Sequence, residues 1–224
     1  MKVTTDACLF GAWLAEEVKS EKIKVESVLD IGTGTALLSL MLAQKISETN
    51  ILAIEIDEDA EMQARENVEG SPWKNRIDIL EGDVKDYNFP EKFDLIISNP
   101  PFYEKELRSE SERKNLAHHS ENLTLGQVLA IVKKYLNPDG NFFLLLPYKR
   151  NDEIKKLFKD HHLHISKMIF VRQSVKHEYF RIIIKGNLDG KEKETEFDEI
   201  SICDEKQQYT SEFVKLLKDY YLHL

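Results

Sequence analysis

Four short polar or glycine-rich segments of this sequence have residue types that could do chemistry. They are Asp30-Ile31-Gly32-Thr33-Gly34-Thr35-Ala36, Glu55 with Asp57, Glu81-Gly82-Asp83-Val84, and Asn99-Pro100-Pro101-Phe102. Each follows an apolar run that is typical of a buried strand. Because the carboxyl ends of parallel strands meet at one edge of a sheet, where ligands bind, we expect the four segments to form one site.

The glycine-rich segment favours a ligand with positive charge. Gly32 and Gly34 let the backbone approach a ligand, and the following helix offers free N–H groups. A phosphate-binding loop needs Gly-Lys-Ser/Thr, and a dinucleotide fingerprint needs a third glycine where Leu37 stands. Asp30 would repel a pyrophosphate but suits a cofactor that carries an ammonium and a sulfonium group. The alternative is a tight turn that binds nothing.

Two acids at later strand ends are candidates for the nucleoside part of the same cofactor. Glu55 could accept hydrogen bonds from ribose hydroxyls, as an acid does in dinucleotide-binding folds. Asp57 is the near alternative, but it falls where a helix begins and suits that helix N-terminus. Asp83 could accept from the adenine amino group, or it could simply be a turn residue.

The Asn-Pro-Pro-Phe segment suits methylation of a weakly nucleophilic nitrogen, whose lone pair is delocalised into a base or an amide. The Asn99 side-chain oxygen and the Pro100 carbonyl could accept from its NH2 group and hold the nitrogen in line with a methyl donor. Pro100 and Pro101 fix the loop backbone, and Phe102 would stack on a flat substrate. The alternative is that Asn-Pro-Pro merely ends a strand.

The elements around these segments predict an α/β fold. Predicted strands cover 28–31, 51–56, 77–80, 93–98, 142–146, 165–171 and 179–185; predicted helices cover 6–18, 37–46, 60–68, 125–136, 152–159 and 211–221. Their alternation indicates a doubly wound, mostly parallel, Rossmann-like sheet of seven strands. The last two strands are expected to form an antiparallel hairpin at the sheet edge. A turn is predicted at Pro138-Asp139-Gly140, and a charged stretch covers 189–205.

At 224 residues the chain has the length of one α/β domain. We expect a single domain over 1–224, with an N-terminal helical segment (1–26), a core (27–186) and a C-terminal appendage (187–224). No apolar run could cross a bilayer and no signal-peptide pattern is present, so we expect a cytoplasmic protein. Cys8 and Cys203 cannot form a disulfide framework or a zinc site, and we expect no metal.

The net charge of -9 argues against nonspecific adhesion to nucleic acid, and no DNA partner is expected. A local basic patch could still contact RNA. The candidate groups are Arg108, Arg113 and Lys114; Lys149 and Arg150; and Arg172, Lys176 and Arg181. Each group could equally be a solvated face. No obligate protein partner is evident.

Together these residues resemble the class I S-adenosylmethionine-dependent methyltransferases over roughly 28–147. More narrowly, the sequence is similar to the bacterial family that N6-methylates adenosine 37 in the anticodon loop of valine tRNA. The resemblance is carried by Met1-Lys2-Val3-Thr4-Thr5-Asp6 with Leu9-Phe10-Gly11-Ala12-Trp13, Arg65-Glu66-Asn67-Val68 before Ser71-Pro72-Trp73, Asn99-Pro100-Pro101-Phe102, and the ending Tyr209-Thr210-Ser211-Glu212-Phe213 to Tyr220-Tyr221-Leu222.

The resemblance implies S-adenosylmethionine as cofactor and a tRNA adenine as substrate, with Thr5 and Asp6 near the methionine end of the cofactor. The predicted cofactor-binding residues are Thr5, Asp6, Asp30, Gly32, Thr33, Gly34, Glu55, Ile56, Asp83, Val84 and Asn99. The predicted catalytic residues are Asn99, Pro100, Pro101 and Phe102.

Two departures from the family pattern stand out. A basic and aromatic stretch usually precedes the Met-Lys-Val segment, so we expect that it was trimmed here or that the start was misplaced. Ala117-His118-His119 stands where Ala-Arg-His is expected, which makes His118 a candidate replacement for an arginine contact to phosphate.

Other acceptors and one other class of protein stay open from the residues alone. Release-factor glutamine methyltransferases and ribosomal RNA guanine-N2 methyltransferases use a similar loop, and glutamine presents a planar NH2 group as adenine does. A noncatalytic RNA-binding protein could keep the same fold. The intact residues Asp30, Gly32, Gly34, Glu55 and Asn99 argue against that last alternative.

Overall fold

The computed structural model describes residues 3–21, 24–100, 123–188 and 194–224. Its α-helices are α1 (Thr5–Ser20), α2 (Leu37–Lys45), α3 (Glu58–Glu69), α5 (Leu125–Tyr135), α6 (Asn151–Asp160) and α7 (Ser211–Leu217), with 3-10 helices η1 (Lys74–Arg76), η2 (Val84–Asp86) and η3 (Tyr148–Arg150). Its strands are β1 (Ser27–Ile31), β2 (Asn50–Glu55), β3 (Ile77–Glu81), β4 (Phe93–Ser98), β5 (Leu136–Pro147), β6 (His164–Ser174), β7 (Tyr179–Asn187) and β8 (Glu196–Cys203). None of the helices in the described ranges is long and apolar enough to cross a membrane.

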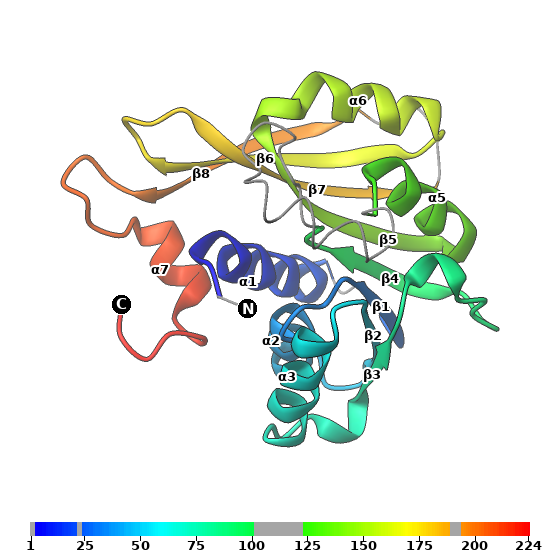
Figure 1. The fold of residues 1–224 in the computed structure, drawn as a ribbon. Helices are drawn as coiled ribbons and strands as arrows, with labels where there is room; N and C mark the ends of the chain where they lie inside the picture. Colours follow the sequence, from blue (N-terminus) through cyan, green and yellow to red (C-terminus); the bar gives the residue numbers. More distant parts are fainter. Residues whose placement is uncertain (1–2, 22–23, 101–122, 189–193) are drawn as a thin grey trace, which may run out of the picture.

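The strands form one sheet with helices on both faces (Figure 1). Within the described residues the order is β3-β2-β1-β4-β5-β7-β6-β8. The five neighbouring strands β3, β2, β1, β4 and β5 run parallel to one another. Strand β7 is antiparallel to β5 and β6, and β8 is parallel to β6. Helices α1, α2, α3 and α7 pack on one face, and α5 and α6 on the other. The predicted doubly wound, mostly parallel α/β fold is confirmed, with its topological switch point between β1 and β4.

The described sheet has eight strands, one more than the sequence predicted, because β8 lies within the charged stretch. Glu196, Asp198 and Glu199 are exposed, and the buried apolar positions, such as Ile200 and Ile202, come only in the second half of the strand. The alternation that reveals a half-buried strand is therefore short. The predicted hairpin of β6 and β7 is present, but β8 lies outside it and forms the edge of the sheet.

The predicted turn at Pro138-Asp139-Gly140 lies inside β5. Phe93 of β4 pairs with Leu136, whereas Leu95 pairs with Asn141, so the intervening residues of β5 bulge out of the ladder. Leu136 is fully buried, so the strand already contributes to the core before the bulge. The turn residues thus bend a strand rather than separate a helix from one.

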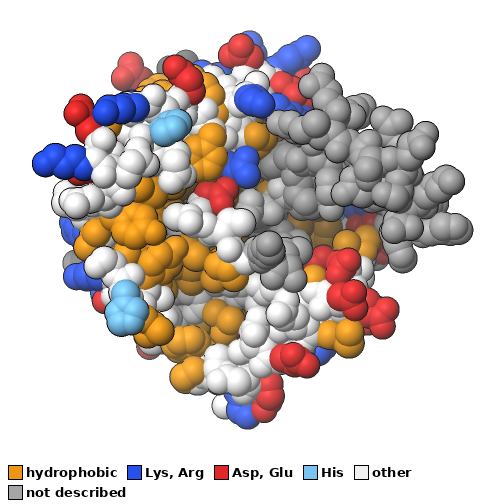
Figure 2. Space-filling model, turned by 60° about the vertical axis from the view of Figure 1, so that its left-hand side comes forward, with side chains coloured by type: hydrophobic (Ala, Val, Ile, Leu, Met, Phe, Trp, Pro, Cys, Tyr) orange, Lys and Arg blue, Asp and Glu red, His pale blue; other side chains and the backbone are white. Residues whose placement is uncertain are grey.

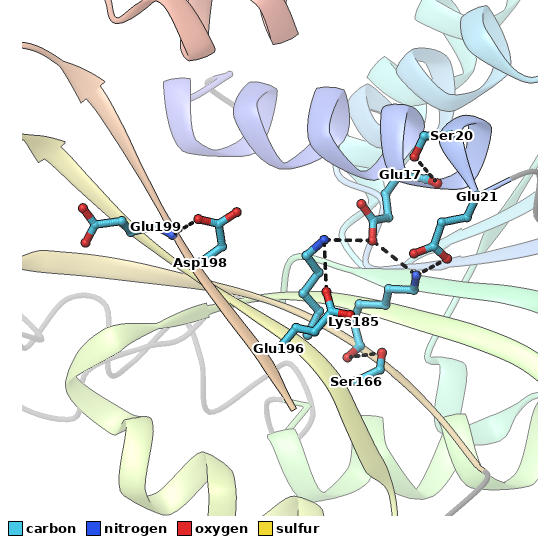
Figure 3. Close-up of polar contacts among 9 residues, drawn as sticks. Glu17, Ser20, Glu21, Ser166, Lys185, Glu196, Asp198 and Glu199 are labelled. Atoms are coloured by element: carbon cyan, nitrogen blue, oxygen red, sulfur yellow. Dashed lines mark hydrogen bonds and ion pairs between the residues drawn. The ribbon is translucent and has the colours of Figure 1, made fainter. Parts of the chain in front are cut away.

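Helix α1 is anchored along β7 by ion pairs at both of its ends. Near its C-terminus, Lys185 Nζ of β7 lies 3.3 Å from Glu17 Oε1 and also contacts Glu21 (Figure 3). The Lys185 side chain is only 7% exposed, so this cation needs its acidic partners. In the first turn of α1, Arg181 Nε donates to Asp6 Oδ2 at 2.7 Å. These contacts fix the position of the helix that carries Thr5 and Asp6.

Candidate active site

The four predicted segments start from neighbouring positions at one edge of the sheet. Ile31, the last residue of β1, lies level with Ile54 of β2 and Ser98 of β4. Glu55 lies level with Glu81 of β3. The Ser98 hydroxyl donates to the Ile31 carbonyl at 2.7 Å, which ties the end of β4 to that of β1. Figure 2 brings this edge forward and shows hydrophobic side chains gathered around a hollow.

The Asp30 carboxyl group is fully buried at the end of β1. Its Oδ2 accepts from Thr33 Oγ1 at 2.6 Å and from Ser39 Oγ at 2.7 Å, whereas Oδ1 has no hydrogen-bond partner within the described structure. Burial raises the pKa of Asp30 to about 6, because the lost solvation outweighs the bonds from Thr33 and Ser39, and the charge of Glu55 adds to the rise. A buried carboxylate oxygen without a donor is a site that a cationic ligand group would complete.

The loop after β1 has a backbone that requires glycine and leaves room beside it. Gly32 and Gly34 have φ values of 68° and 60°. A Cβ atom at Gly32 would meet nothing within 4 Å, so this side of the loop faces open space. The N–H groups of Gly32 and Thr33 both donate to the Ile54 carbonyl, at 2.9 and 3.1 Å. The loop is therefore held firmly to β2, and a ligand can approach its backbone closely.

Glu55 ends β2, is buried and faces the loop after β1. Its Oε2 accepts from the Gly34 N–H at 2.8 Å, and its Oε1 accepts from the N–H groups of Ile56 and Asp57 at 2.9 and 3.0 Å. A carboxylate has about four lone-pair sites, so Glu55 can accept further hydrogen bonds from a ligand. Asp57 instead caps α3, where its side chain accepts from the Ala60 N–H at 2.9 Å. Glu55 thus faces the glycine-rich loop, whereas Asp57 serves the N-terminus of α3.

Ile56 and Asp83 border the site on the side of β3. Ile56 is 53% exposed and presents an apolar surface directly after Glu55. Asp83 is the N-cap of η2, where its carboxylate accepts from the Lys85 N–H at 3.0 Å and pairs with Lys85 Nζ at 3.1 Å. Val84 is buried beneath this turn. An apolar surface next to a hydrogen-bond acceptor is suited to a nucleobase.

Asn99 and Pro100 follow β4 at the same edge, and Asn99 is half-buried while Pro100 is buried. Asn99 is the first residue after β4. It directly follows Ser98, which pairs with Ile31, the last residue of β1. The predicted residues Pro101 and Phe102 lie outside the described residues. So do three of the basic candidates, Arg108, Arg113 and Lys114, together with His118.

Thr5 and Asp6 lie in the first turn of α1, and both are half-buried. Burial by itself would raise the pKa of Asp6, but hydrogen bonds from Thr4 and Arg181 and the charge of Arg181 outweigh it and lower the pKa below its ordinary value. Asp6 is therefore a charged carboxylate held by β7.

Sequence reasoning missed two polar residues that support the site. Ser39 is a fully buried serine of α2 that donates to Asp30. Its only signal is a polar residue among the apolar positions that start this helix. Arg181 was predicted only as part of a basic patch, and the structure shows that it forms an ion pair with Asp6. No local pattern could have shown that pair, because the two residues are far apart in the sequence.

Known proteins match both the sequence and the fold. Residues 11–170 match the family model described as the methyltransferase small domain. Over 227 residues, the chain is 37% identical to the tRNA1(Val) (adenine(37)-N6)-methyltransferase of Bacteroides thetaiotaomicron, and the match covers 100% of this chain and 92% of that protein. The chain belongs to this family. Residues 1–6 and the Ser71-Pro72-Trp73 segment, which suggested the family, lie within the aligned length.

Solved structures give this tRNA (adenine-N6)-methyltransferase family member the class I methyltransferase fold. A protein of Agrobacterium tumefaciens, described as a predicted O-methyltransferase, matches with a TM-score of 0.72 at 14% identity, covering 94% of this chain and 95% of that one. A glycopeptide N-methyltransferase complexed with S-adenosyl-L-methionine matches with a TM-score of 0.57 at 11% identity, covering 80% and 88%. At these identities the likeness concerns the fold alone.

Proposed function

We propose that this protein transfers a methyl group from S-adenosylmethionine to the N6 amino group of adenosine 37 in tRNA1(Val), in the cytoplasm. The observation that carries the proposal is membership of the tRNA1(Val) (adenine(37)-N6)-methyltransferase family over the whole chain. The geometry agrees with it, because Asp30, Glu55 and Asn99 start from one edge of the sheet.

The residues at this edge fit S-adenosylmethionine. Asp30 Oδ1 is buried without a donor, and open space adjoins Gly32. We assign to Asp30, Gly32, Thr33 and Gly34 the cationic amino-acid end of the cofactor, because a buried carboxylate stabilises a nearby positive charge. Thr5 and Asp6, on α1, are further candidates for this end.

The nucleoside part of the cofactor is assigned to the strand ends on the β3 side. Glu55 has hydrogen-bonding capacity left for the two ribose hydroxyls. The exposed face of Ile56 would pack on the adenine ring, Val84 would support it from below, and Asp83 would accept from the adenine amino group.

The methyl-transfer step is assigned to the residues that follow β4. The cofactor supplies an electrophilic methyl group bonded to a sulfonium. The Asn99 side-chain oxygen and the Pro100 carbonyl accept the two N–H groups of the substrate amine, which orients its lone pair toward the methyl carbon. When bound, the cofactor would supply the methyl carbon for the new N–C bond, and the electron pair of the broken C–S bond would stay on sulfur. The extra proton leaves the nitrogen for water afterwards, so no strong general base is needed. Pro101 would stiffen this loop and Phe102 would stack on the target base.

Labelled methyl transfer tests the reaction and its acceptor. The protein is incubated with radiolabelled S-adenosylmethionine and tRNA from cells that lack the modification, and the labelled nucleoside is identified after digestion. We expect label in N6-methyladenosine of tRNA1(Val). Label only in ribosomal RNA guanine, or in a release-factor glutamine, would overturn the proposed substrate while keeping the cofactor assignment.

Replacing Asn99 tests the mechanism. The Asn99→Ala variant should lower kcat by about 100-fold or more, the usual effect of removing a preorganised hydrogen-bonding group, while the Kd for the cofactor stays nearly unchanged. The matched control is Asn137→Ala, because the Asn137 side chain donates to Asp94 at 2.7 Å near the amino ends of β4 and β5. Near-normal turnover in Asn99→Ala would contradict the mechanism.

A further inference from the structure

Three aromatic rings gather near the catalytic edge, on the side of β5, β6 and β7. Tyr148 of η3, Phe170 of β6 and Tyr179 of β7 form this aromatic cluster. The Tyr148 and Tyr179 ring centroids are 5.3 Å apart, and those of Phe170 and Tyr179 are 5.4 Å apart. Each of the three residues is half-buried, so part of the cluster is open to solvent.

The register of the sheet places the cluster next to the segment after β4. Ser98, the last residue of β4, pairs with Leu144 of β5, and β5 continues to Pro147. Strands rise ~3.3 Å per residue and lie ~4.8 Å apart, so Pro147 extends about 10 Å beyond the end of β4 on the adjacent strand. Tyr148 follows at once. The cluster therefore borders the space in front of Asn99.

The β6–β7 hairpin brings the other two rings to the same end of the sheet. Pro147 pairs with Arg181 near the start of β7, and Arg172 near the end of β6 pairs with Tyr179. The edge at which β5 ends is thus also the edge at which β6 ends and β7 begins (Figure 1).

Polar contacts hold the Tyr179 ring in place. Its hydroxyl contacts Glu199 of β8, and the Arg172 guanidinium lies 5.5 Å from its ring centroid. Arg172 itself is fixed by Glu199 at 2.5 Å and by the Ser201 hydroxyl at 2.7 Å. β8, the strand that the sequence concealed, therefore fixes the orientation of the ring and of the cation on it.

Two of the predicted basic groups surround the cluster. Lys149 follows Tyr148 directly, and Lys176 lies between β6 and β7; both residues are exposed. Arg150 is bonded to Glu153, as Arg172 is to Glu199, so the local charge is mixed. The surface is therefore mainly aromatic. Lys149 and Lys176 add local positive charge to a chain whose net charge is -9.

We infer that the aromatic cluster binds the unpaired nucleotides next to the methylated adenosine, by stacking their bases on Tyr148 and Tyr179 while Lys149 and Lys176 contact their phosphates. The inference rests on the proposed function. An enzyme that acts on a base must take it out of its stack, so the neighbouring bases lose a stacking partner. Aromatic side chains replace such partners in proteins that bind unpaired RNA.

Binding of an anticodon stem-loop RNA tests the inference. Fluorescence anisotropy gives the Kd for the full chain and for Tyr148→Ala, Tyr148→Phe and Lys149→Glu, and calorimetry gives the Kd for S-adenosylmethionine. Loss of one base–aromatic stack should weaken RNA binding on the order of 10- to 100-fold in Tyr148→Ala, while Tyr148→Phe keeps the ring and stays near wild type. Lys149→Glu should weaken binding and lower the slope of log Kd against log salt by about 1. The control Lys74→Glu makes the same charge change in η1, before β3 and at the opposite edge, and should bind RNA as wild type does.

The outcomes separate this inference from the proposed function. If the wild type methylates adenosine 37 but Tyr148→Ala and Lys149→Glu bind the stem-loop as tightly as wild type, the inference is wrong and the function stands. If the wild type methylates no tRNA, the proposed function fails. If Tyr148→Ala loses S-adenosylmethionine binding as well, the ring supports the fold and this variant cannot report on RNA contacts. The comparison of Lys149→Glu with Lys74→Glu then tests the inference. Equal RNA affinities of these two variants would overturn it.

Discussion

Replacing Asp30 by Asn should remove a loss of stability that the protein suffers as the pH rises. Asp30 is fully buried, and its pKa is raised from the ordinary 3.8 to about 6, chiefly by burial. The folded state therefore holds the proton more tightly than the unfolded chain, and stability falls as the pH rises from about 4 to about 6. A shift of roughly two units corresponds to about 3 kcal/mol. In the proposed assignment, the cationic end of the cofactor would offset this cost when it binds next to the carboxylate.

The geometry determines what Asn changes. Its side-chain oxygen can still accept from Thr33 and Ser39, as Oδ2 of Asp30 does. Its NH2 group takes the place of the buried Oδ1, which has no partner in the described structure. A buried donor without an acceptor costs about 1–3 kcal/mol, but this cost does not depend on pH. The quantity to measure is therefore how the difference in unfolding free energy between the Asp30→Asn variant and the wild type changes with pH.

Urea unfolding of both proteins from pH 4 to pH 8 measures this quantity. The stability of the variant minus that of the wild type should rise by about 3 kcal/mol over this range, with most of the rise below pH 6. Cofactor affinity should fall in the wild type as the pH drops through about 6, and should be weak at every pH in the variant. The control is Asp94→Asn, because the pKa of Asp94 is lowered, burial being outweighed by hydrogen bonds from Glu26, Asn137 and Ser27. A stability difference for Asp30→Asn that is flat with pH would refute the reasoning.

Three further substitutions test the loop and the anchoring of α1. Gly32→Ala should cost about 1–2 kcal/mol of stability in thermal unfolding, because the φ of 68° is strained for alanine although nothing blocks its Cβ. Lys185→Met leaves Glu17 buried with one remaining lysine at 3.4 Å, so it should lower the free energy of unfolding by about 3 kcal/mol, or by less if that lysine compensates. Adding Glu17→Gln should restore part of this loss, and no recovery in the double variant would contradict the stabilising role of the Lys185–Glu17 ion pair. Arg181→Met should lower the free energy of unfolding above pH 4, and this effect should fade as the pH falls further. The reason is that the hydrogen bonds that lower the pKa of Asp6, one of them from Arg181, outweigh the effect of its burial. Acid titration followed by circular dichroism checks this.

Most of the fold could be predicted from the sequence because its parallel core has simple signals. The strands from β1 to β4 are short apolar runs, and their boundaries differ from the predicted ones by about one residue. β8 could not be predicted in the same way, because Glu196 and Asp198 are exposed although they lie on the same face of the strand as the buried Ile200 and Ile202, so the alternation is lost in its first half. The bulge in β5 was taken for a turn because the same residue types serve both structures.

The candidate site was predictable where a polar residue directly follows an apolar strand, because such residues meet at one edge of a parallel sheet. Asp30, Glu55, Asp83 and Asn99 all stand at strand ends of one sheet edge, as expected. Partners that come from other elements were not predictable. The bond from Ser39 depends on how α2 packs over β1, and the roles of the basic residues depend on which face of β6 and β7 carries them.

The packing of α1 has a consequence for the order in which the chain can fold during synthesis. α1 leaves the ribosome early, yet its ion-pair partners Lys185 and Arg181 are made more than 160 residues later, and Phe213 and Leu217 of α7, which share its core cluster, later still. A growing chain that ends before β7 can pack α1 against α2 and the first strands, but it lacks Lys185, Arg181 and α7, which complete the burial of this almost entirely buried helix. The contacts around Thr5 and Asp6 are therefore completed only after β7 has been made, so a product truncated before β7 should leave part of α1 accessible to proteases.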